Sequence, residues 1–146
     1  MAITKINGGI TAPKGFLASG LNAGIKNQTK KDMAMVFSST PCAAAGVFTS
    51  NLVKAAPVKW DKEIVTTSPY VQAVVVNSGI ANACTGAEGL GYCADTAAEA
   101  AAALNIPKTA VLVASTGVIG KQLPIDKIKY GVTALSKVLG SSREDA

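Results

Sequence analysis

The chain has 146 residues, of which 49% are hydrophobic and only 16% are charged, a balance that fits one packed domain and excludes a disordered tail. It contains no histidine, so catalysis by Ser-His or Cys-His pairs and histidine-ligated metals are excluded within these residues. No apolar run approaches the roughly 20 residues that a membrane-spanning helix requires. The composition therefore predicts a folded domain with no membrane partner.

The cysteines and the basic residues exclude two further classes of site. Cys42, Cys84 and Cys93 match no zinc-binding spacing, which predicts small buried cysteines in a reducing compartment and no metal site. The N-terminus lacks the apolar core of a secretory signal, and we therefore expect a cytoplasmic protein. The net charge of +5 comes from lysines, since Arg143 is the only arginine, and this is a poor composition for a nucleic-acid partner.

The first half of the chain predicts turns followed by strands. Residues 1–25 are interrupted by glycine and proline, which indicates turns with short extended pieces. The apolar runs at 33–39 and 43–49 are separated by only a few turn residues, so they predict two adjacent antiparallel strands. Residues 71–76 are rich in β-branched side chains and predict a central strand buried on both faces.

The next segments predict a helix and a second central strand. Residues 85–104 are rich in alanine, which favours a helix packed closely on its neighbours, and Asn105 followed by Pro107 is a stop signal. Residues 110–114 predict a strand that ends at Ser115.

The C-terminal part predicts a further helix. Pro124 opens an amphipathic pattern that closes at Gly140. Residues 141–144 fit the capping box that starts a helix, which suggests that the sequence is a piece of a longer protein. Together the elements indicate an α+β layered domain, with a mixed or antiparallel sheet and helices on one face.

Two familiar kinds of site are absent from the pattern. Residues 115–122 resemble a phosphate loop, but Ser115 replaces the first glycine and Gln122 replaces the hydroxyl residue that binds magnesium, so no nucleotide cofactor is expected. Asp95 and Glu99 share a helix face, which we interpret as a solvated surface because no pocket-forming sequence flanks them.

Residues 114–120, at the end of the second central strand, carry the remaining chemistry. Small and hydroxyl residues there, with glycine to permit a tight turn, could present hydrogen-bond donors to a negatively charged oxygen, as in an oxyanion hole. The alternative is a plain turn from strand to loop, and many strands end in this way. Residues 77–86, after the first central strand, have the same character.

Several blocks of sequence resemble the bifunctional ornithine acetyltransferase (glutamate N-acetyltransferase) family of arginine biosynthesis. They are AAGVFT at 44–49, AAPV at 55–58, VNSGIANACTG at 76–86 and STGVIG at 115–120. They follow the order of the family, from residues 8–16 to residues 141–146, so the resemblance covers essentially the whole chain.

The resemblance implies an ornithine acetyltransferase-like α+β fold and a two-chain enzyme. In this family a precursor cuts itself ahead of a threonine, which becomes the nucleophile at the start of the β chain. Its free α-amine can activate the hydroxyl, so no histidine is needed. Residues 1–146 would form a single domain, the N-terminal portion of the α chain, incomplete without the rest of that chain and the β chain. The assembly would be a hetero-oligomer, a heterotetramer in the family.

The resemblance also assigns roles. Matched by position, the oxyanion-hole pair of the family falls on Thr116 and Gly117, which would offer a hydroxyl and a backbone amide. The acetyl group would pass from N-acetylornithine to the threonine and then to glutamate, with no cofactor, and some members also accept acetyl-CoA. The alternatives are a related self-processing aminopeptidase and a truncated, non-catalytic binding module.

Overall fold

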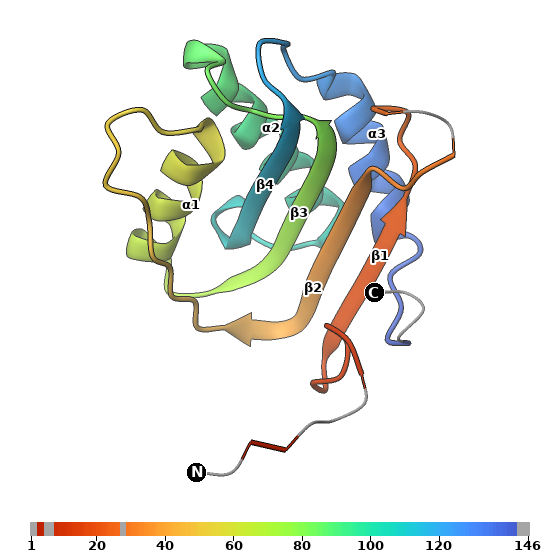
Figure 1. Cartoon of the computed structure of the whole chain (residues 1–146). Helices are drawn as coiled ribbons and strands as arrows, with labels where there is room; N and C mark the ends of the chain where they lie inside the picture. Colours follow the sequence, from red (N-terminus) through yellow and green to blue (C-terminus); the bar gives the residue numbers. More distant parts are fainter. Residues whose placement is uncertain (1–2, 5–7, 27–28, 143–146) are drawn as a thin grey trace.

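The structure, a computed structural model, describes residues 3–4, 8–26 and 29–142, which form a sheet with helices packed against it (Figure 1). The elements are β1 (Phe16–Leu21), β2 (Met33–Cys42), α1 (Ala56–Thr67), β3 (Val71–Ile80), α2 (Gly86–Leu104), the short 3-10 helix η1 (Lys108–Ala110), β4 (Val111–Val118) and α3 (Ile125–Ser136). The strand order is β1-β2-β3-β4, antiparallel up to β3 and parallel between β3 and β4. The predicted α+β fold with a mixed sheet is confirmed.

The core lies between the sheet and the two helices α2 and α3. Its buried residues include Met33, Met35, Ala73, Val75 and Val111 from the sheet, and Ala97, Ala100, Ile128, Val132 and Leu135 from the helices. The alanines of α2 have only methyl side chains, so this helix can approach its neighbours closely, as its sequence predicted. No helix in the described ranges has the length and apolar character needed to cross a bilayer.

Both predicted helices are present. α2 spans the predicted residues, and its cap Asn105 adopts the left-handed conformation with φ +54°, which asparagine tolerates better than most residues. α3 begins after Pro124 as predicted but ends at Ser136. The predicted end at Gly140 is wrong because the chain leaves the helix to bridge β1, where Gly140 and Ala18 exchange backbone hydrogen bonds of 2.9 and 3.0 Å. The predicted capping box runs into residues 143–144, which lie outside the described part.

The other face of the sheet is open. Along β3, Ala73 and Val75 are each only 2% exposed, whereas Val74 and Val76 between them are half-buried. The prediction that this strand is buried on both faces is therefore wrong. Alternate residues of a strand point to opposite faces, and the described helices cover only one of them (Figure 1).

The predicted hairpin pairs the wrong segments. β2 pairs with β1, and residues 43–49 form no strand but lead from β2 towards α1. Pro41 near the end of β2 has no amide hydrogen to donate, and the pairing with β3 shifts register between Phe37 and Cys42. Val47 in the connecting segment is fully exposed. An apolar run alone was not a sufficient signal for a strand.

The sequence analysis missed α1. Its signal was Pro57, which the structure places at the first positions of the helix, where its missing amide hydrogen costs nothing. The helix contacts β4 and α2, and it lies along the outer edge of the sheet (Figure 1).

Candidate active site

The carboxyl ends of β3 and β4 carry the polar residues that the sequence singled out. Ser78 lies opposite Thr116, and Gly79 lies opposite Gly117. The sequence analysis placed Thr116 and Gly117 in a loop after the strand, and this placement is wrong. Both belong to β4, because the parallel pairing with β3 continues past them.

Two glycines with positive φ face each other at the ends of β3 and β4. Gly79 has φ +113° and Gly117 has φ +136°, a region that residues with side chains rarely adopt. A Cβ atom on Gly117 would lie 2.3 Å from the carbonyl carbon of Gly79, which is closer than real Cβ contacts. Position 117 therefore requires glycine both for its backbone conformation and for the space beside it.

The Thr116 hydroxyl is available to a ligand. Thr116 and Gly117 are exposed, unlike Val111 and Val113 at the start of the same strand. The Thr116 hydroxyl has no hydrogen-bond partner among the described residues. A hydroxyl with a free donor on an exposed strand end can bind an incoming oxygen atom without first breaking a protein contact.

The Gly117 amide points away from β3. Successive residues of a strand direct their amides to opposite edges, and the Val111 carbonyl and the Val113 amide face the outer edge of β4, where α1 binds them. By the same alternation, the Val118 carbonyl faces β3, where it accepts a 3.0 Å hydrogen bond from Ala81. The Gly117 amide, in step with Val113, faces the outer edge of the sheet.

A buried asparagine joins the two strand ends. Asn77 is 5% exposed, and its Nδ2 donates a 2.9 Å hydrogen bond to the carbonyl of Ile80. Its Oδ1 accepts a hydrogen bond from the Ser115 hydroxyl across the pair of strands. The residue immediately before Thr116 is thereby fixed to β3, which limits the movement of Thr116.

A second buried asparagine holds the loop after β3. Asn82 is 2% exposed; its Nδ2 donates to the Gly89 carbonyl at 2.8 Å, and its Oδ1 accepts from the Thr85 hydroxyl at 2.7 Å. Its own carbonyl accepts a 3.2 Å hydrogen bond from the amide of Ala56, the first residue of α1. The loop is therefore tied to the first turns of both α1 and α2.

α1 binds the outer edge of β4 through two side chains. Trp60 Nε1 donates to the Val111 carbonyl at 3.0 Å, and Asp61 Oδ1 accepts from the Val113 amide at 2.9 Å. These contacts satisfy backbone groups that an edge strand would otherwise leave unpaired. We call Trp60 and Asp61 together the α1 clasp.

Burial raises the pKa values of two titratable groups near this edge, Asp61 and Cys93. It raises the pKa of Asp61 to about 6, although the hydrogen bond from Val113 acts in the opposite direction. Burial, with a further contribution from the charge of Asp61, raises the pKa of the Cys93 thiol to about 12. Cys93 therefore remains a neutral thiol and cannot serve as a nucleophile near neutral pH.

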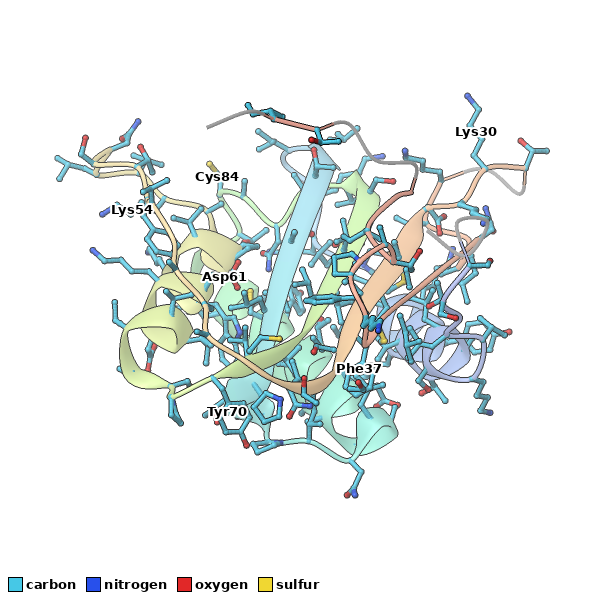
Figure 2. All side chains as sticks on the ribbon, turned by 90° about the horizontal axis from the view of Figure 1, so that it is seen from below. Lys30, Phe37, Lys54, Asp61, Tyr70 and Cys84 are labelled. Carbon is cyan, nitrogen blue, oxygen red and sulfur yellow. The ribbon has the colours of Figure 1, made fainter. Side chains whose placement is uncertain are left out.

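The predicted burial of all three cysteines is only partly right. Cys93 is buried, Cys42 is half-buried, and Cys84 is exposed, as Figure 2 shows, with a φ of +57°. All three are free thiols. Cys84 lies in the turn that leads into α2, where the chain has to pass over the surface before the helix begins.

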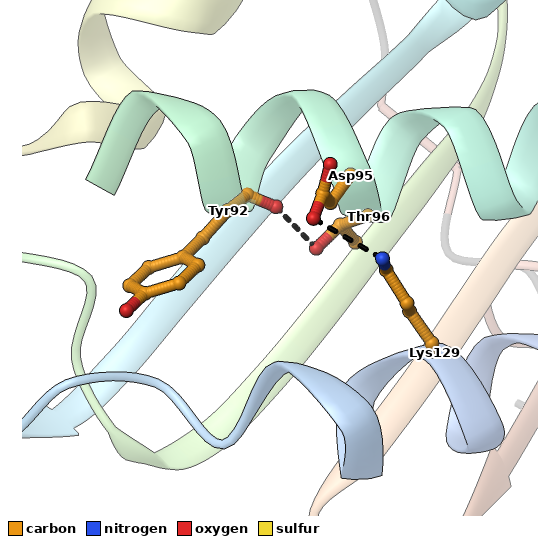
Figure 3. A network of polar contacts seen from close by, with 4 residues as sticks. All are labelled: Tyr92, Asp95, Thr96 and Lys129. Atoms are coloured by element: carbon orange, nitrogen blue, oxygen red, sulfur yellow. Dashed lines mark hydrogen bonds and ion pairs between the residues drawn. The ribbon is translucent and has the colours of Figure 1, made fainter. Parts of the chain in front are cut away.

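Two carboxylates of α2, those of Asp95 and Glu99, bind side chains of α3. Asp95 of α2 forms a 3.1 Å ion pair with Lys129 of α3 (Figure 3), and Glu99 accepts a 2.5 Å hydrogen bond from the Thr133 hydroxyl. The carboxylate of Asp95 and the ammonium of Lys129 are both substantially exposed, so the ion pair contributes little to stability. Within the described ranges no three metal-ligating side chains gather in one group.

A family model described as the ArgJ family matches residues 17–146. This chain belongs to the ArgJ family. Two relatives, each named arginine biosynthesis bifunctional protein ArgJ, illustrate the similarity. The protein from Thermotoga neapolitana is 49% identical over 128 residues, which are 87% of this chain and 32% of the relative. The protein from Gloeobacter violaceus is 48% identical over 141 residues, 97% of this chain and 35% of the relative.

Crystal structures of ArgJ proteins share the fold. The ArgJ protein from Bacillus halodurans has a TM-score of 0.89 and 40% identity, over 95% of this chain and 71% of the crystallised chain. The ornithine acetyltransferase from Mycobacterium tuberculosis, crystallised with ornithine, has a TM-score of 0.90 and 45% identity, over 94% of this chain and 74% of that chain. The predicted family and fold are confirmed.

The chain spans about a third of the length of these curated ArgJ relatives.

Sequence reasoning found Thr116 and Gly117 but missed the groups around them: Gly79, the Asn77–Ser115 hydrogen bond and the α1 clasp. Gly79 had a signal, since a glycine follows each central strand at a corresponding distance. The α1 clasp had none, because it depends on how a helix packs against an edge strand.

Proposed function

We propose that this chain is the N-terminal portion of the α chain of an ornithine acetyltransferase, a cytoplasmic glutamate N-acetyltransferase, and that Thr116 and Gly117 form its oxyanion hole. The observation that carries the proposal is the exposed Thr116 hydroxyl, which has no partner in the described part of the chain, on a member of the ArgJ family. Beside it lies Gly117, whose amide the alternation along β4 directs outwards. The strand and its cross-links fix both donors in advance, which is the arrangement that stabilises developing charge most effectively.

The reaction has two half-reactions through an acetyl-threonine. The N-terminal threonine of the β chain gives its hydroxyl proton to its own α-amine as its oxygen attacks the acetyl carbon of N-acetylornithine. The carbonyl π electrons move onto the oxygen, which Thr116 and Gly117 stabilise. Collapse of this intermediate breaks the bond to the ornithine nitrogen, which takes up the proton. The glutamate amine then attacks the acetyl-threonine, and the reverse sequence releases N-acetylglutamate and restores the threonine.

Two observations support a second chain. The region matched here is 32–35% of the curated relatives but 71–74% of the crystallised chains, so those crystallised chains are about half as long as the curated proteins. Two chains cut from one precursor would have this relation. In addition, the uncovered sheet face carries the half-buried Val36, Val74 and Val76, an apolar surface that the β chain can cover.

The experiment uses the complete enzyme, expressed from a precursor that contains this chain. Mass spectrometry should detect a second polypeptide that begins with threonine, and incubation with N-acetylornithine and glutamate should yield N-acetylglutamate. Thr116→Ala should lower turnover by about 100- to 1,000-fold, the usual loss for an oxyanion-hole donor, with unchanged thermal stability because Thr116 is exposed.

The outcomes separate the alternatives. Release of free acetate or amino acids without acetylglutamate would indicate a self-processing aminopeptidase. Binding of ornithine without any turnover would indicate a non-catalytic module. Turnover that is unchanged in Thr116→Ala would contradict the oxyanion assignment while leaving the acetyltransferase activity intact.

A further inference from the structure

Gly117 needs support from its surroundings to hold its amide in one direction. It has no side chain to pack, and its φ of +136° lies in a region that other residues rarely adopt. Before it in the strand, Ser115 is bound to β3 by its hydrogen bond to Asn77. After it, the Val118 carbonyl accepts a 3.0 Å hydrogen bond from the amide of Ala81. The direction of the Gly117 amide therefore depends on two hydrogen bonds, one on each side of it.

Asn82 fixes the second of these hydrogen bonds. It directly follows Ala81, it is 2% exposed, and all its side-chain hydrogen-bonding groups have partners. Its Nδ2 donates to the Gly89 carbonyl at 2.8 Å and to Cys93 Sγ at 3.3 Å. Its Oδ1 accepts a 2.7 Å hydrogen bond from the Thr85 hydroxyl. Asn82 cannot turn without breaking several contacts at once, and this also limits the movement of Ala81.

The backbone of Asn82 is held as well. Its carbonyl accepts a 3.2 Å hydrogen bond from the amide of Ala56, one of the first amides of α1, which have no acceptor within their own helix. α1 and α2 begin, and β3 and β4 end, at the same end of the sheet (Figure 1). Through Asn82 and the adjoining Ala81, the protein joins all four elements at this end.

Close packing around Asn82 leaves no room for another arrangement. A Cβ atom on Gly89 would lie 2.7 Å from Asn82 Oδ1 and 2.1 Å from Thr85 Oγ1, so α2 approaches this pair closely only because residue 89 is glycine. Thr85 is the cap residue of α2, yet its hydroxyl makes no capping hydrogen bond to the helix. The hydroxyl is used instead to orient Asn82.

We propose that Asn82 is a positioning residue for the candidate oxyanion hole. By holding the loop after β3, it keeps the Ala81 amide on the Val118 carbonyl and so keeps the Gly117 amide directed outwards. The inference rests on the proposed function, because it takes Gly117 to donate to the acetyl oxygen. Asn82 acts only through other residues, since its own side chain is buried and its hydrogen-bonding groups are used within the protein.

The kinetic test uses Asn82→Ala, Thr85→Val and Ser19→Ala in the complete enzyme. Ser19→Ala is the control for Thr85→Val, since each removes one buried hydroxyl hydrogen bond; Ser19 lies on β1, at the opposite edge of the sheet from β4, and donates to the Leu135 carbonyl. Well below the unfolding temperatures, Asn82→Ala should lower kcat by about 10- to 100-fold with little change in KM.

Thr85→Val removes only one of the contacts of Asn82, so it should lower kcat in the same direction but by less than Asn82→Ala. Ser19→Ala should leave kcat unchanged. If Asn82→Ala does not fold, the comparison of the other two variants decides. Equal kcat values in Thr85→Val and Ser19→Ala would overturn the proposal.

A vibrational measurement separates positioning from a purely structural role. p-Nitrophenyl acetate labelled with carbon-13 at its carbonyl acetylates the nucleophile, and an oxyanion hole that polarises this carbonyl lowers its stretching frequency. In the wild type and in Ser19→Ala the band should lie below that of free O-acetylthreonine. In Asn82→Ala, and to a smaller extent in Thr85→Val, it should move towards the free value. A band that stays at the wild-type frequency in both variants would overturn the proposal.

Hydrogen exchange distinguishes this inference from the proposed function. A wild-type enzyme without acetyl transfer would overturn the acetyltransferase proposal, but the exchange of the Ala81 amide would still report on Asn82. This amide should exchange faster in Asn82→Ala and in Thr85→Val than in the wild type, and at the wild-type rate in Ser19→Ala. Equal protection of the Ala81 amide in all the proteins would overturn the positioning role of Asn82.

Discussion

The two halves of β4 differ sharply in their environment. The first half, around Val111 and Val113, is buried beneath α2 and bound along its outer edge by the α1 clasp. The second half, at Thr116 and Gly117, is exposed and has a glycine conformation that ordinary strands do not use. The comparison teaches that one strand can combine a buried half with an exposed half. The buried half is held by its packing and hydrogen bonds, and it thereby keeps the hydrogen-bond donors of the exposed half in position.

The largest effect should come from a side chain at position 117. Gly117→Ala would strain the positive φ and push a methyl group into the backbone of Gly79, so we expect a loss of about 3 kcal/mol in the free energy of unfolding and loss of detectable activity. Gly120→Ala is the matched control, since Gly120 has φ +92° but open space around its Cβ position, and it should lose about 1 kcal/mol. Urea titration measures both, and equal losses would show that the contact with Gly79 is unimportant.

The next effect concerns the first half of β4. Asp61→Ala leaves the Val113 amide without its acceptor and should lower the free energy of unfolding by about 2 kcal/mol. Asp61→Asn keeps an oxygen in the same position, so its loss should be below about 1 kcal/mol. If the two variants were equally unstable by urea titration, the hydrogen bond to Val113 would not be what Asp61 contributes.

A smaller effect is expected where the two halves meet. Ser115→Ala removes the hydrogen bond to the buried Asn77 and should cost about 1 kcal/mol in stability. Because Ser115 adjoins Thr116, turnover should also fall, by about tenfold, with little change in KM. Steady-state kinetics well below the unfolding temperature checks this, and a change confined to KM would speak against a role in positioning Thr116.

The smallest effect is a pH dependence that originates at Asp61. Its pKa is about 6 in the folded protein, above the ordinary value of 3.8, so between these values the folded state binds more protons than the unfolded state. The corresponding stabilisation is fully present below about pH 4 and is lost as the pH rises through about 6. Screening by solvent limits it to about 1 kcal/mol. The difference in unfolding free energy between the wild type and Asp61→Asn should shrink from pH 4 to pH 7; a constant difference would exclude Asp61 as its source.

The same contrast explains what the sequence could predict. The strand at 71–76 and the helices α2 and α3 were predictable because β-branched runs, alanine content and apolar spacing are local properties of the chain. The strand at 43–49 was wrongly predicted because its apolar residues gave no information about what would cover them. β4 was predicted too short, since Thr116 and Gly117 stay in the sheet only through their pairing with β3.

The candidate site was predictable only in part. Thr116 and Gly117 could be named because they match a family motif. The contacts that position them could not, since Asn77 reaches Ser115 and Trp60 reaches Val111 across long separations in sequence.

The α1 clasp also gives this domain a built-in optical probe. Trp60 is the only tryptophan in the 146 residues, and its indole N–H donates a hydrogen bond to the Val111 carbonyl, with the Lys108 ammonium 5.8 Å from the ring centre. Detachment of α1 from the sheet edge would move this indole into water and shift its fluorescence emission to longer wavelength. Release of the helix could therefore be followed in real time without attaching a dye.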